Sequence, residues 1–323
     1  RGDSCGLNVQ WLKKQATRSL VVIHRGNVED RDAVERAVGT YGGVDCVVHA
    51  AAQVSIDASM LNPSADFLSN TVGTFTVLDV IRQRCPTAKF VHVTSNKVLD
   101  MSAWPVERVG SQYRWIDHPV GPSEQDMWQY LAAKEPYGAS KLSGLHYCRA
   151  YAVMYGMPVV IAVPSGMYGP RQYGNAAQGW LGWFVIATEL GLPIVIRGDG
   201  YQVRDMLHVG DVCTALDTML GVADIYKGSL FNIGGGSENA VSLLEALDLI
   251  RMVTGNKPII RFDKVRPQDD RVFVTNCERM VGLGWYPRVD IRDGIISVVQ
   301  WARSVRVDLD LLYTADIQDS LCQ

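Results

Sequence analysis

The sequence predicts an α/β fold in which helices cover both faces of a doubly wound parallel sheet. Short apolar runs rich in β-branched residues alternate with segments of helical periodicity, which is the order that βαβ units produce. The expected strands are residues 20–24, 45–50, 89–93 and 158–163, and the expected helices are 31–38, 67–82 and 137–155. A length of 323 residues with 47% hydrophobic content supports a substantial core, built as one large domain or two coupled lobes.

The second half of the chain predicts two further helices. Ser242 and Glu245 have the spacing of a capping box, so we expect a helix from there to Val253 that ends at Gly255. Residues 291–305 alternate apolar and polar positions as a surface helix does. Residues 179–196 are strongly apolar, but Glu189 interrupts them and they fall short of the roughly 20 residues that a membrane span needs. We expect core or pocket wall there.

Charge and composition narrow the class of partner. A net charge of −3 without any Lys/Arg-rich run argues against nucleic acid and favours a small molecule. The seven cysteines are scattered without a C-x-x-C motif, which is typical of reduced thiols in the cytoplasm. The six histidines show no metal-ligand spacing, so we predict no metal site.

Three side chains predict oxidation of a hydroxyl group. Tyr137 and Lys141 are four residues apart in an expected helix, so they emerge on one face about one turn apart. A neighbouring ammonium lowers the pKa of a phenol from about 10 toward that of a general base, which makes Lys141 the expected tuner of Tyr137. Ser95 follows a buried strand, at the sheet edge where ligands bind, and could hold the reacting oxygen. Taken alone, the Tyr-x-x-x-Lys spacing also suits an ordinary amphipathic helix.

Longer segments decide between these interpretations, because the chain resembles the extended short-chain dehydrogenase/reductases of the NAD-dependent epimerase/dehydratase family. It is most similar to the group that epimerises C2 of CDP-linked sugars. The segments that carry the resemblance are 94–98, 165–172, 178–183, 202–208 and 270–274. The resemblance implies an NAD-binding, Rossmann-like domain over residues 1–163 and mainly a smaller α/β lobe for a nucleotide sugar over 164–323, with some segments returning to the sheet. It places Ser95, Tyr137 and Lys141 on the catalytic positions.

The family's glycine-rich Gly-x-x-Gly-x-x-Gly turn is absent from the sequence. In the family, the first strand, this turn and the following helix hold the dinucleotide pyrophosphate. We therefore expect that the first βαβ part is missing and that the sequence is incomplete. If these residues were the whole molecule, NAD would bind weakly or not at all.

The resemblance implies two sets of binding residues. Those expected at NAD are Asn27, Val28, His49, Ala50, Ala51, Gln53, Asn70 and Thr94, together with Tyr137 and Lys141. Residues 49–53 are also compatible with a plain strand-to-loop turn, and Asn70 with a packing role. Those expected at the substrate are Lys97, Gln178, Trp180, Arg204, Arg266, Asp269 and Arg271.

A guanidinium suits diphosphate because its fork binds phosphate oxygens in pairs, so Arg204 is expected there. The cluster of Arg266, Asp269 and Arg271 is also compatible with a surface salt-bridge group, and Lys97 with a solvated strand end.

The residues after Ser95 favour epimerisation over dehydration. Family dehydratases carry an acidic residue there because elimination of water needs an acid or base beside the carbon that loses hydroxide, whereas this chain has Asn96 and Lys97. We expect inversion at C2 of a CDP-hexose through a transient keto sugar. A 4-epimerase, a 4,6-dehydratase and a non-catalytic nucleotide-sugar-binding protein remain alternatives. The resemblance also implies a homodimer or homotetramer formed through helices 67–82 and 137–155.

Overall fold

A four-stranded parallel sheet organises the N-terminal half of the protein. The computed structural model describes residues 4–15, 21–40, 42–266 and 269–321. The sheet has the order β1 (Cys46–His49), β2 (Lys89–Val93), β5 (Val159–Pro164) and β9 (Leu230–Ile233), and neighbouring strands all run parallel. The predicted strands at 45–50, 89–93 and 158–163 are confirmed to within one residue.

The strand predicted at residues 20–24 is wrong. Residues 21–24 have no regular structure, and residue 20 lies outside the described residues. Val21, Val22 and Ile23 are more than one third exposed. Their β-branched composition suits a strand, but strand formation requires backbone hydrogen bonds to a neighbour, and β1 is the last strand on this side of the described sheet.

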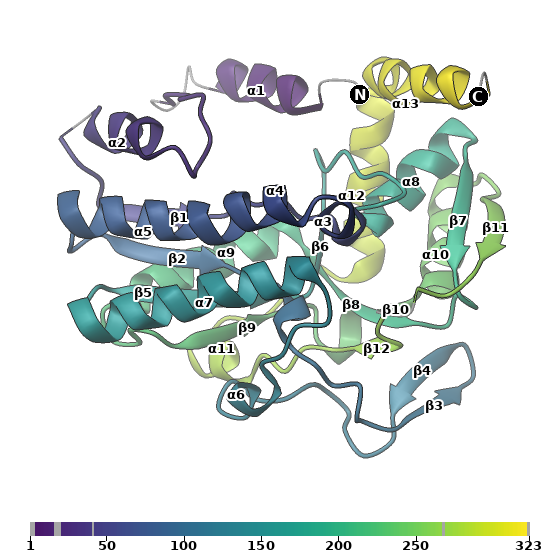
Figure 1. Cartoon of the computed structure of the whole chain (residues 1–323). Helices are drawn as coiled ribbons and strands as arrows, with labels where there is room; N and C mark the ends of the chain where they lie inside the picture. The colour runs from purple at the N-terminus through teal and green to yellow at the C-terminus, as the bar shows by residue number, and fades with distance from the viewer. Residues whose placement is uncertain (1–3, 16–20, 41, 267–268, 322–323) are drawn as a thin grey trace.

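Helices cover both faces of the sheet, as predicted. One face packs against α2 (Arg31–Gly39), α5 (Gly73–Arg84) and α7 (Pro136–Tyr155), and Figure 1 shows α5 and α7 side by side along it. The other face packs against α9 (Val209–Val222) and α11 (Glu278–Gly282). Alternate residues of one strand serve the two cores: Phe90 points into the first and Val91 into the second.

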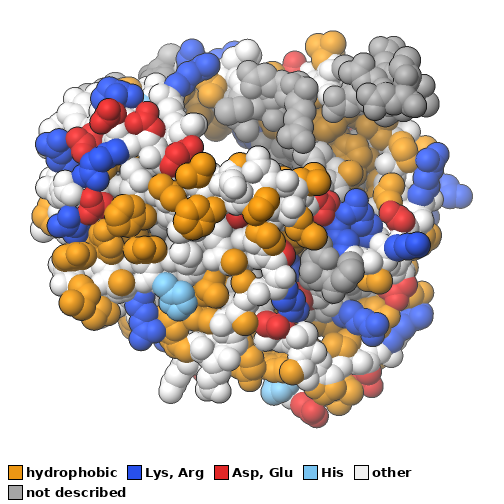
Figure 2. All heavy atoms as spheres, in the orientation of Figure 1, with side chains coloured by type: hydrophobic (Ala, Val, Ile, Leu, Met, Phe, Trp, Pro, Cys, Tyr) orange, Lys and Arg blue, Asp and Glu red, His pale blue; other side chains and the backbone are white. Residues whose placement is uncertain are grey.

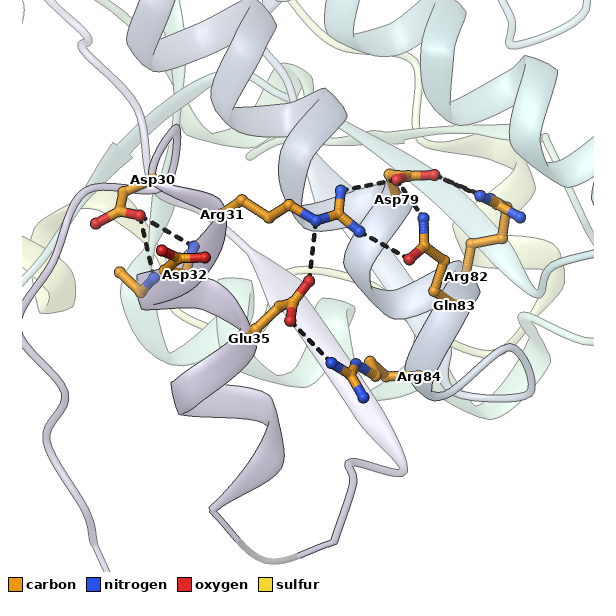
Figure 3. Close-up of polar contacts among 9 residues, drawn as sticks. Asp30, Arg31, Asp32, Glu35, Asp79, Arg82, Gln83 and Arg84 are labelled. Atoms are coloured by element: carbon orange, nitrogen blue, oxygen red, sulfur yellow. Dashed lines mark hydrogen bonds and ion pairs between the residues drawn. The ribbon is translucent and has the colours of Figure 1, made fainter.

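An ionic network attaches α2 to α5 (Figure 3). Asp30 caps α2 by accepting hydrogen bonds from two backbone amides of its first turn. Arg31 donates to Glu35 within α2 and to Asp79 on α5, both at 2.9 Å. Arg84 reaches back from α5 to Glu35 at 2.9 Å. Arg31 and Arg84 are exposed and Glu35 is partly exposed, so their ion pairs fix geometry more than they add stability, whereas Asp79 is mostly buried.

The helix predicted at 67–82 has a different start. It is preceded by α3 (Ile56–Leu61) and α4 (Pro63–Phe67), and a π-helical turn, η1 (Leu68–Val72), joins α4 to α5. A π-helical turn inserts one residue into the helix and re-aims the side chains in it. Asn70 lies in this turn and points into the protein, where it is 2% exposed.

The C-terminal half forms a second core around smaller sheets. β8 (Val203–His208) pairs with β6 (Gly166–Tyr168), β10 (Ala240–Ser242) and β12 (Val272–Phe273), while β7 (Pro193–Arg197) pairs with β11 (Ile259–Asp263). Helices α8 (Trp180–Leu190), α10 (Leu243–Thr254) and α12 (Ile291–Ser304) supply most of its apolar side chains. The remaining elements are α1 (Ser4–Gln15), the 3-10 turns η2 (Asn96–Val98) and η3 (Ser237–Asn239), the hairpin of β3 (Val106–Val109) and β4 (Gln112–Trp115), α6 (Met127–Tyr130) and α13 (Arg306–Leu321).

The capping box and the apolar segment predicted for this half are confirmed. Ser242 and Glu245 cap each other reciprocally, and α10 ends at Gly255 in the left-handed conformation. The apolar segment 179–196 divides into the buried helix α8 and strand β7. Within the described part of the chain, none of the helices has the length and apolar character needed to cross a membrane.

Candidate active site

The three predicted catalytic residues meet at the carboxyl edge of the parallel sheet. Ser95 follows β2, and Tyr137 and Lys141 lie in the first two turns of α7, which packs along one face of the sheet. All three are buried, with 8%, 8% and 4% exposure. The Ser95 side chain lies close enough to the Tyr137 phenol to lower its pKa, and the backbone amide of Tyr137 donates to Ser59 Oγ at 3.2 Å. The spacing of the two motifs therefore brings the phenol and the hydroxyl together.

The electrostatics of this group differ from the expected tuning. Burial raises the pKa of Tyr137 above its usual value, and the nearby Ser95 side chain opposes this increase. Lys141 Nζ instead donates to the backbone carbonyl of Val93 at 2.6 Å. Burial lowers the pKa of Lys141 to about 8. The ammonium is thus directed at the end of β2 in this structure, and burial dominates the proton affinity of the phenol.

Asn70 connects the loop after β1 to α7. Its side chain accepts from the backbone amide of Gln53 at 2.8 Å and donates to the Gln53 carbonyl at 2.9 Å. It also lies 3.0 Å from Ser140 Oγ on α7 and 3.1 Å from Asp66 Oδ1. The geometry favours the packing role over direct contact with a ligand. Thr94 acts similarly, because its hydroxyl donates to the Lys141 carbonyl at 3.3 Å.

A stacked histidine pair lies beneath this site. The rings of His49 and His92 are 5.5 Å apart, and His49 Nε2 is 3.1 Å from Thr74 Oγ1. Burial, with the nearby charge of Lys141, lowers the pKa of His49 to about 4, so both rings are neutral near pH 7. The ring of His49 is packed inside the protein, whereas Ala50 and Ala51 are exposed where β1 ends.

Several predicted substrate residues lie beside two adjoining cavities. Lys97 Nζ donates to Asp270 Oδ2, and Arg204 Nη2 donates to Asp269 Oδ1, both at 2.7 Å. Asp269 and Arg271 line adjoining cavities of about 340 and 310 Å³. The cations beside Asp270 hold the pKa of its carboxyl at about 2 against the opposing effect of burial.

Arg266 joins the two halves of the protein. Its Nη2 donates to Asp57 Oδ2 on α3 at 2.7 Å, and Arg197 from β7 donates to the same oxygen at 3.1 Å. Arg266 Nε is buried without a hydrogen-bond partner among the described residues. This guanidinium therefore keeps one unmet donor beside a partly satisfied carboxylate.

Other predicted binding residues lie apart from this group. Asn27 is exposed, and Val28 packs beside Gly73 at the start of α5. Gln178 is exposed in a turn that it closes with Asn175, and Trp180 packs against Phe184 within α8. The binding roles of Asn27, Val28, Gln178 and Trp180 stay predictions.

Two acidic residues near Tyr137 were missed by the sequence analysis. Asp66 on α4 and Glu135 at the N-terminus of α7 are 1% and 8% exposed, and both raise the proton affinity of Tyr137. Glu135 lies two residues before Tyr137 and directly before the proline that begins α7, so the sequence could have indicated that it lies near the phenol. Asp66 is close to Tyr137 because α4 packs against α7, and no local sequence pattern predicts this tertiary contact.

Comparison with known proteins agrees with this arrangement. The model of the NAD dependent epimerase/dehydratase family matches residues 8–234. The chain belongs to this family. CDP-paratose 2-epimerase of Salmonella typhi is 31% identical over 305 residues, covering 92% of this chain and 88% of that protein. A dTDP-glucose 4,6-dehydratase of Actinoplanes sp. is 32% identical over 307 residues, covering 93% and 86%.

A solved structure extends the likeness to the fold. The Thermus thermophilus UDP-glucose 4-epimerase in complex with NAD has a TM-score of 0.73 and 26% identity, covering 90% of this chain and 87% of that one. The predictions of an α/β Rossmann-like fold, of an enzyme of this family and of NAD as the cofactor are confirmed.

The residues present fit the reactive end of NAD. Small side chains at Ala50 and Ala51 leave the backbone at the end of β1 open to a close approach. Lys141 and Tyr137 lie beside the neighbouring strand end. Both positions are at the carboxyl ends of parallel strands, where dinucleotides bind in open α/β sheets.

Proposed function

We propose that the protein is an NAD-dependent nucleotide-sugar epimerase that inverts C2 of a CDP-linked hexose. The observation that carries the proposal is the meeting of Ser95, Tyr137 and Lys141 at the carboxyl end of β2. Lys97, two residues after Ser95, pairs with Asp270, which lines the cavity of about 340 Å³. The similarity to CDP-paratose 2-epimerase supports the choice of carbon and nucleotide. Residues 1–163 would mainly bind NAD and residues 164–323 mainly the nucleotide sugar.

The chemistry requires one proton acceptor and one hydride acceptor. Tyr137, as phenolate, takes the proton of the C2 hydroxyl while Ser95 holds the same oxygen, so the O–H and C–H bonds break and a C=O bond forms. NAD, when bound, accepts the hydride and later returns it. The keto sugar presents its other face before the hydride returns, and Tyr137 gives the proton back. No net oxidation results.

Two arginines would bind the diphosphate of the nucleotide sugar. Arg204 and Arg266 are each already oriented by a carboxylate, Asp269 and Asp57, at 2.7 Å. An oriented guanidinium loses less side-chain entropy when it binds phosphate oxygens in pairs. Ala50, Ala51 and Lys141 would lie against NAD, whereas Asn70 and Thr94 would position the elements that hold it.

A 4,6-dehydratase is the second candidate, and one observation favours it. The sequence lacks an acidic residue directly after Ser95, but the fold brings a carboxyl group close to this position, because Glu135 lies near Lys97 and Tyr137. The similarity to dTDP-glucose 4,6-dehydratases is comparable in identity. The two reactions differ in product, since dehydration removes the C6 hydroxyl as water and epimerisation keeps every atom.

The test is incubation of the protein with NAD and separate CDP-, UDP- and GDP-hexoses, with products followed by NMR. Inversion at C2 of a CDP-hexose without loss of water supports the proposal. Inversion at C4, or a product that has lost one water, would replace it with one of the other activities. Absence of any conversion, with the same nucleotide sugars still bound, would favour a binding protein. Tyr137→Phe serves as the inactive control.

We further propose that two copies of the chain assemble through α5 and α7. Figure 2 shows orange side chains gathered over this face. Phe75 and Tyr147 are 39% and 41% exposed, and Val153 and Met154 are 68% and 76% exposed. An apolar surface of this kind marks a protein interface. Light scattering should give a dimer or tetramer, and Met154→Asp should give monomers. A monomeric parent protein would contradict the proposal.

A further inference from the structure

A buried acid stands at the start of α7, where the backbone amide of Gly138 lies close enough to its carboxylate to lower its pKa. Glu135 is the N-cap residue of α7, a position where Ser, Thr, Asp and Asn are strongly preferred. It is 8% exposed, and its Oε1 has no hydrogen-bond partner in the described part of the protein. Buried carboxyl oxygens without partners are rare in native proteins and costly to keep. The residue therefore calls for a role.

The surroundings of Glu135 are closely packed around the same atom. A Cβ at Gly138 would lie 3.2 Å from Glu135 Oε1 and 2.5 Å from the backbone carbonyl of Lys97. The first turn of α7 thus presses Glu135 against the segment that carries Ser95 and Lys97. Only glycine at 138 permits this approach.

Lys97 stands between two carboxylates. Its ammonium lies 2.7 Å from Asp270 and also acts on Glu135, whose pKa it lowers against a larger increase from burial. Lys134 binds the other oxygen of Asp270 at 3.0 Å and Asp100 at 3.0 Å. Alternating charges therefore connect Glu135 with the cavity that Lys134 and Asp270 line.

Glu135 in turn acts on the predicted catalytic phenol. Asp66 from α4 and Glu135 from the start of α7 act on Tyr137, the Ser95 hydroxyl lies close enough to lower its pKa, and Lys141 follows one turn further along α7. Asp66 and Glu135 both favour the protonated phenol. Lys97 acts on Glu135 and Glu135 acts on Tyr137, so Glu135 links the charge of Lys97 to the phenol.

We propose that Glu135 is a positioning residue for the reaction at Tyr137, and that its negative charge, shared with Lys97, controls how readily the phenol gives up its proton. The inference rests on the proposed function. While Lys97 is held by Asp270, Glu135 keeps much of its charge and Tyr137 keeps its proton. When Lys97 turns from Asp270 to Glu135, that charge is compensated, and Tyr137 becomes a better base.

The test is direct titration of Tyr137 in protein labelled with ¹³C at tyrosine Cζ, with the signal assigned by its loss in Tyr137→Phe. Glu135→Gln and Glu135→Ser should shift the Tyr137 titration to lower pH. Asp270→Asn should do the same, because it releases Lys97 to Glu135. Glu124→Gln removes another buried carboxyl and should leave the titration in place.

A double variant separates coupling from direct effects. Lys97→Met should shift the Tyr137 titration to higher pH in the parent protein, and should lose most of this effect in the Glu135→Gln background. A purely structural Glu135 would change urea stability without moving the titration, and would overturn the proposal. So would an effect of Lys97→Met that persists without Glu135. Because the titration needs no turnover, these results are independent of which sugar, if any, is converted.

Discussion

Lys141→Met should make the protein more stable while removing a residue that the proposed reaction needs. Burial moves the pKa of Lys141 from 10.5 to about 8. At about 1.4 kcal/mol per unit, the buried ammonium costs about 3 kcal/mol at pH 7. Methionine has similar volume and no charge, but it loses the hydrogen bond to the Val93 carbonyl, worth about 1 kcal/mol. The variant should therefore gain about 2 kcal/mol.

The stability gained by Lys141→Met should depend on pH. Between about 8 and 10.5 the folded parent protein binds fewer protons than the unfolded chain, so its stability rises with pH across this window. The advantage of Lys141→Met should be full below pH 8 and disappear above 10.5. Urea unfolding of both proteins measures it. Lys227→Met is the matched control, because exposed Lys227 also donates to a backbone carbonyl at 2.7 Å. A Lys141→Met protein less stable than its parent at pH 7, or an advantage unchanged by pH, would refute the reasoning.

Three further changes test other parts of the structure by urea unfolding. Asp270→Asn should cost about 2 kcal/mol at pH 7, because the pKa of Asp270 falls from 3.8 to about 2; this cost should shrink as the pH falls from 3.8 through 2, and a pH-independent cost would contradict it. Gly138→Ala should destabilise the protein, because its Cβ would lie 2.5 Å from the Lys97 carbonyl. Gly221→Ala, in open space, should stabilise it by up to about 1 kcal/mol, and equal effects of the two changes would contradict the prediction. Tyr168→Phe should leave the free energy of unfolding unchanged, because the buried hydroxyl has no hydrogen-bond partner among the described residues. A large loss of stability would contradict this and would show that the hydroxyl has a partner.

The regular part of the fold could be predicted because local composition and tertiary position agree there. β2 (Lys89–Val93) supplies Phe90 to one core and Val91 to the other, and α7 has a proline at its start and Gly156 after its end. Residues 20–24 have the same composition but no strand beside them within the described sheet. A strand depends on its neighbour, and composition alone carries no information about that.

The positions of Ser95, Tyr137 and Lys141 could be predicted because these residues lie in short motifs whose geometry follows from one helix and one strand end. The ion pairs could not be. Arg266 meets Asp57 across 209 positions, and Lys97 meets Asp270 across 173. The expected tuning of Tyr137 by Lys141 failed for a related reason, because burial and the Val93 carbonyl, which only the folded chain creates, govern both groups.

Comparison of the parent protein with Tyr137→Phe tests the central claim most directly. Both proteins are incubated with NAD and a CDP-hexose, and inversion at C2 is followed by NMR after circular dichroism has shown that both are folded. The account predicts inversion by the parent protein and a loss of about 100-fold or more in the variant, which retains the ring but cannot accept the proton. Equal rates for the two proteins would contradict it.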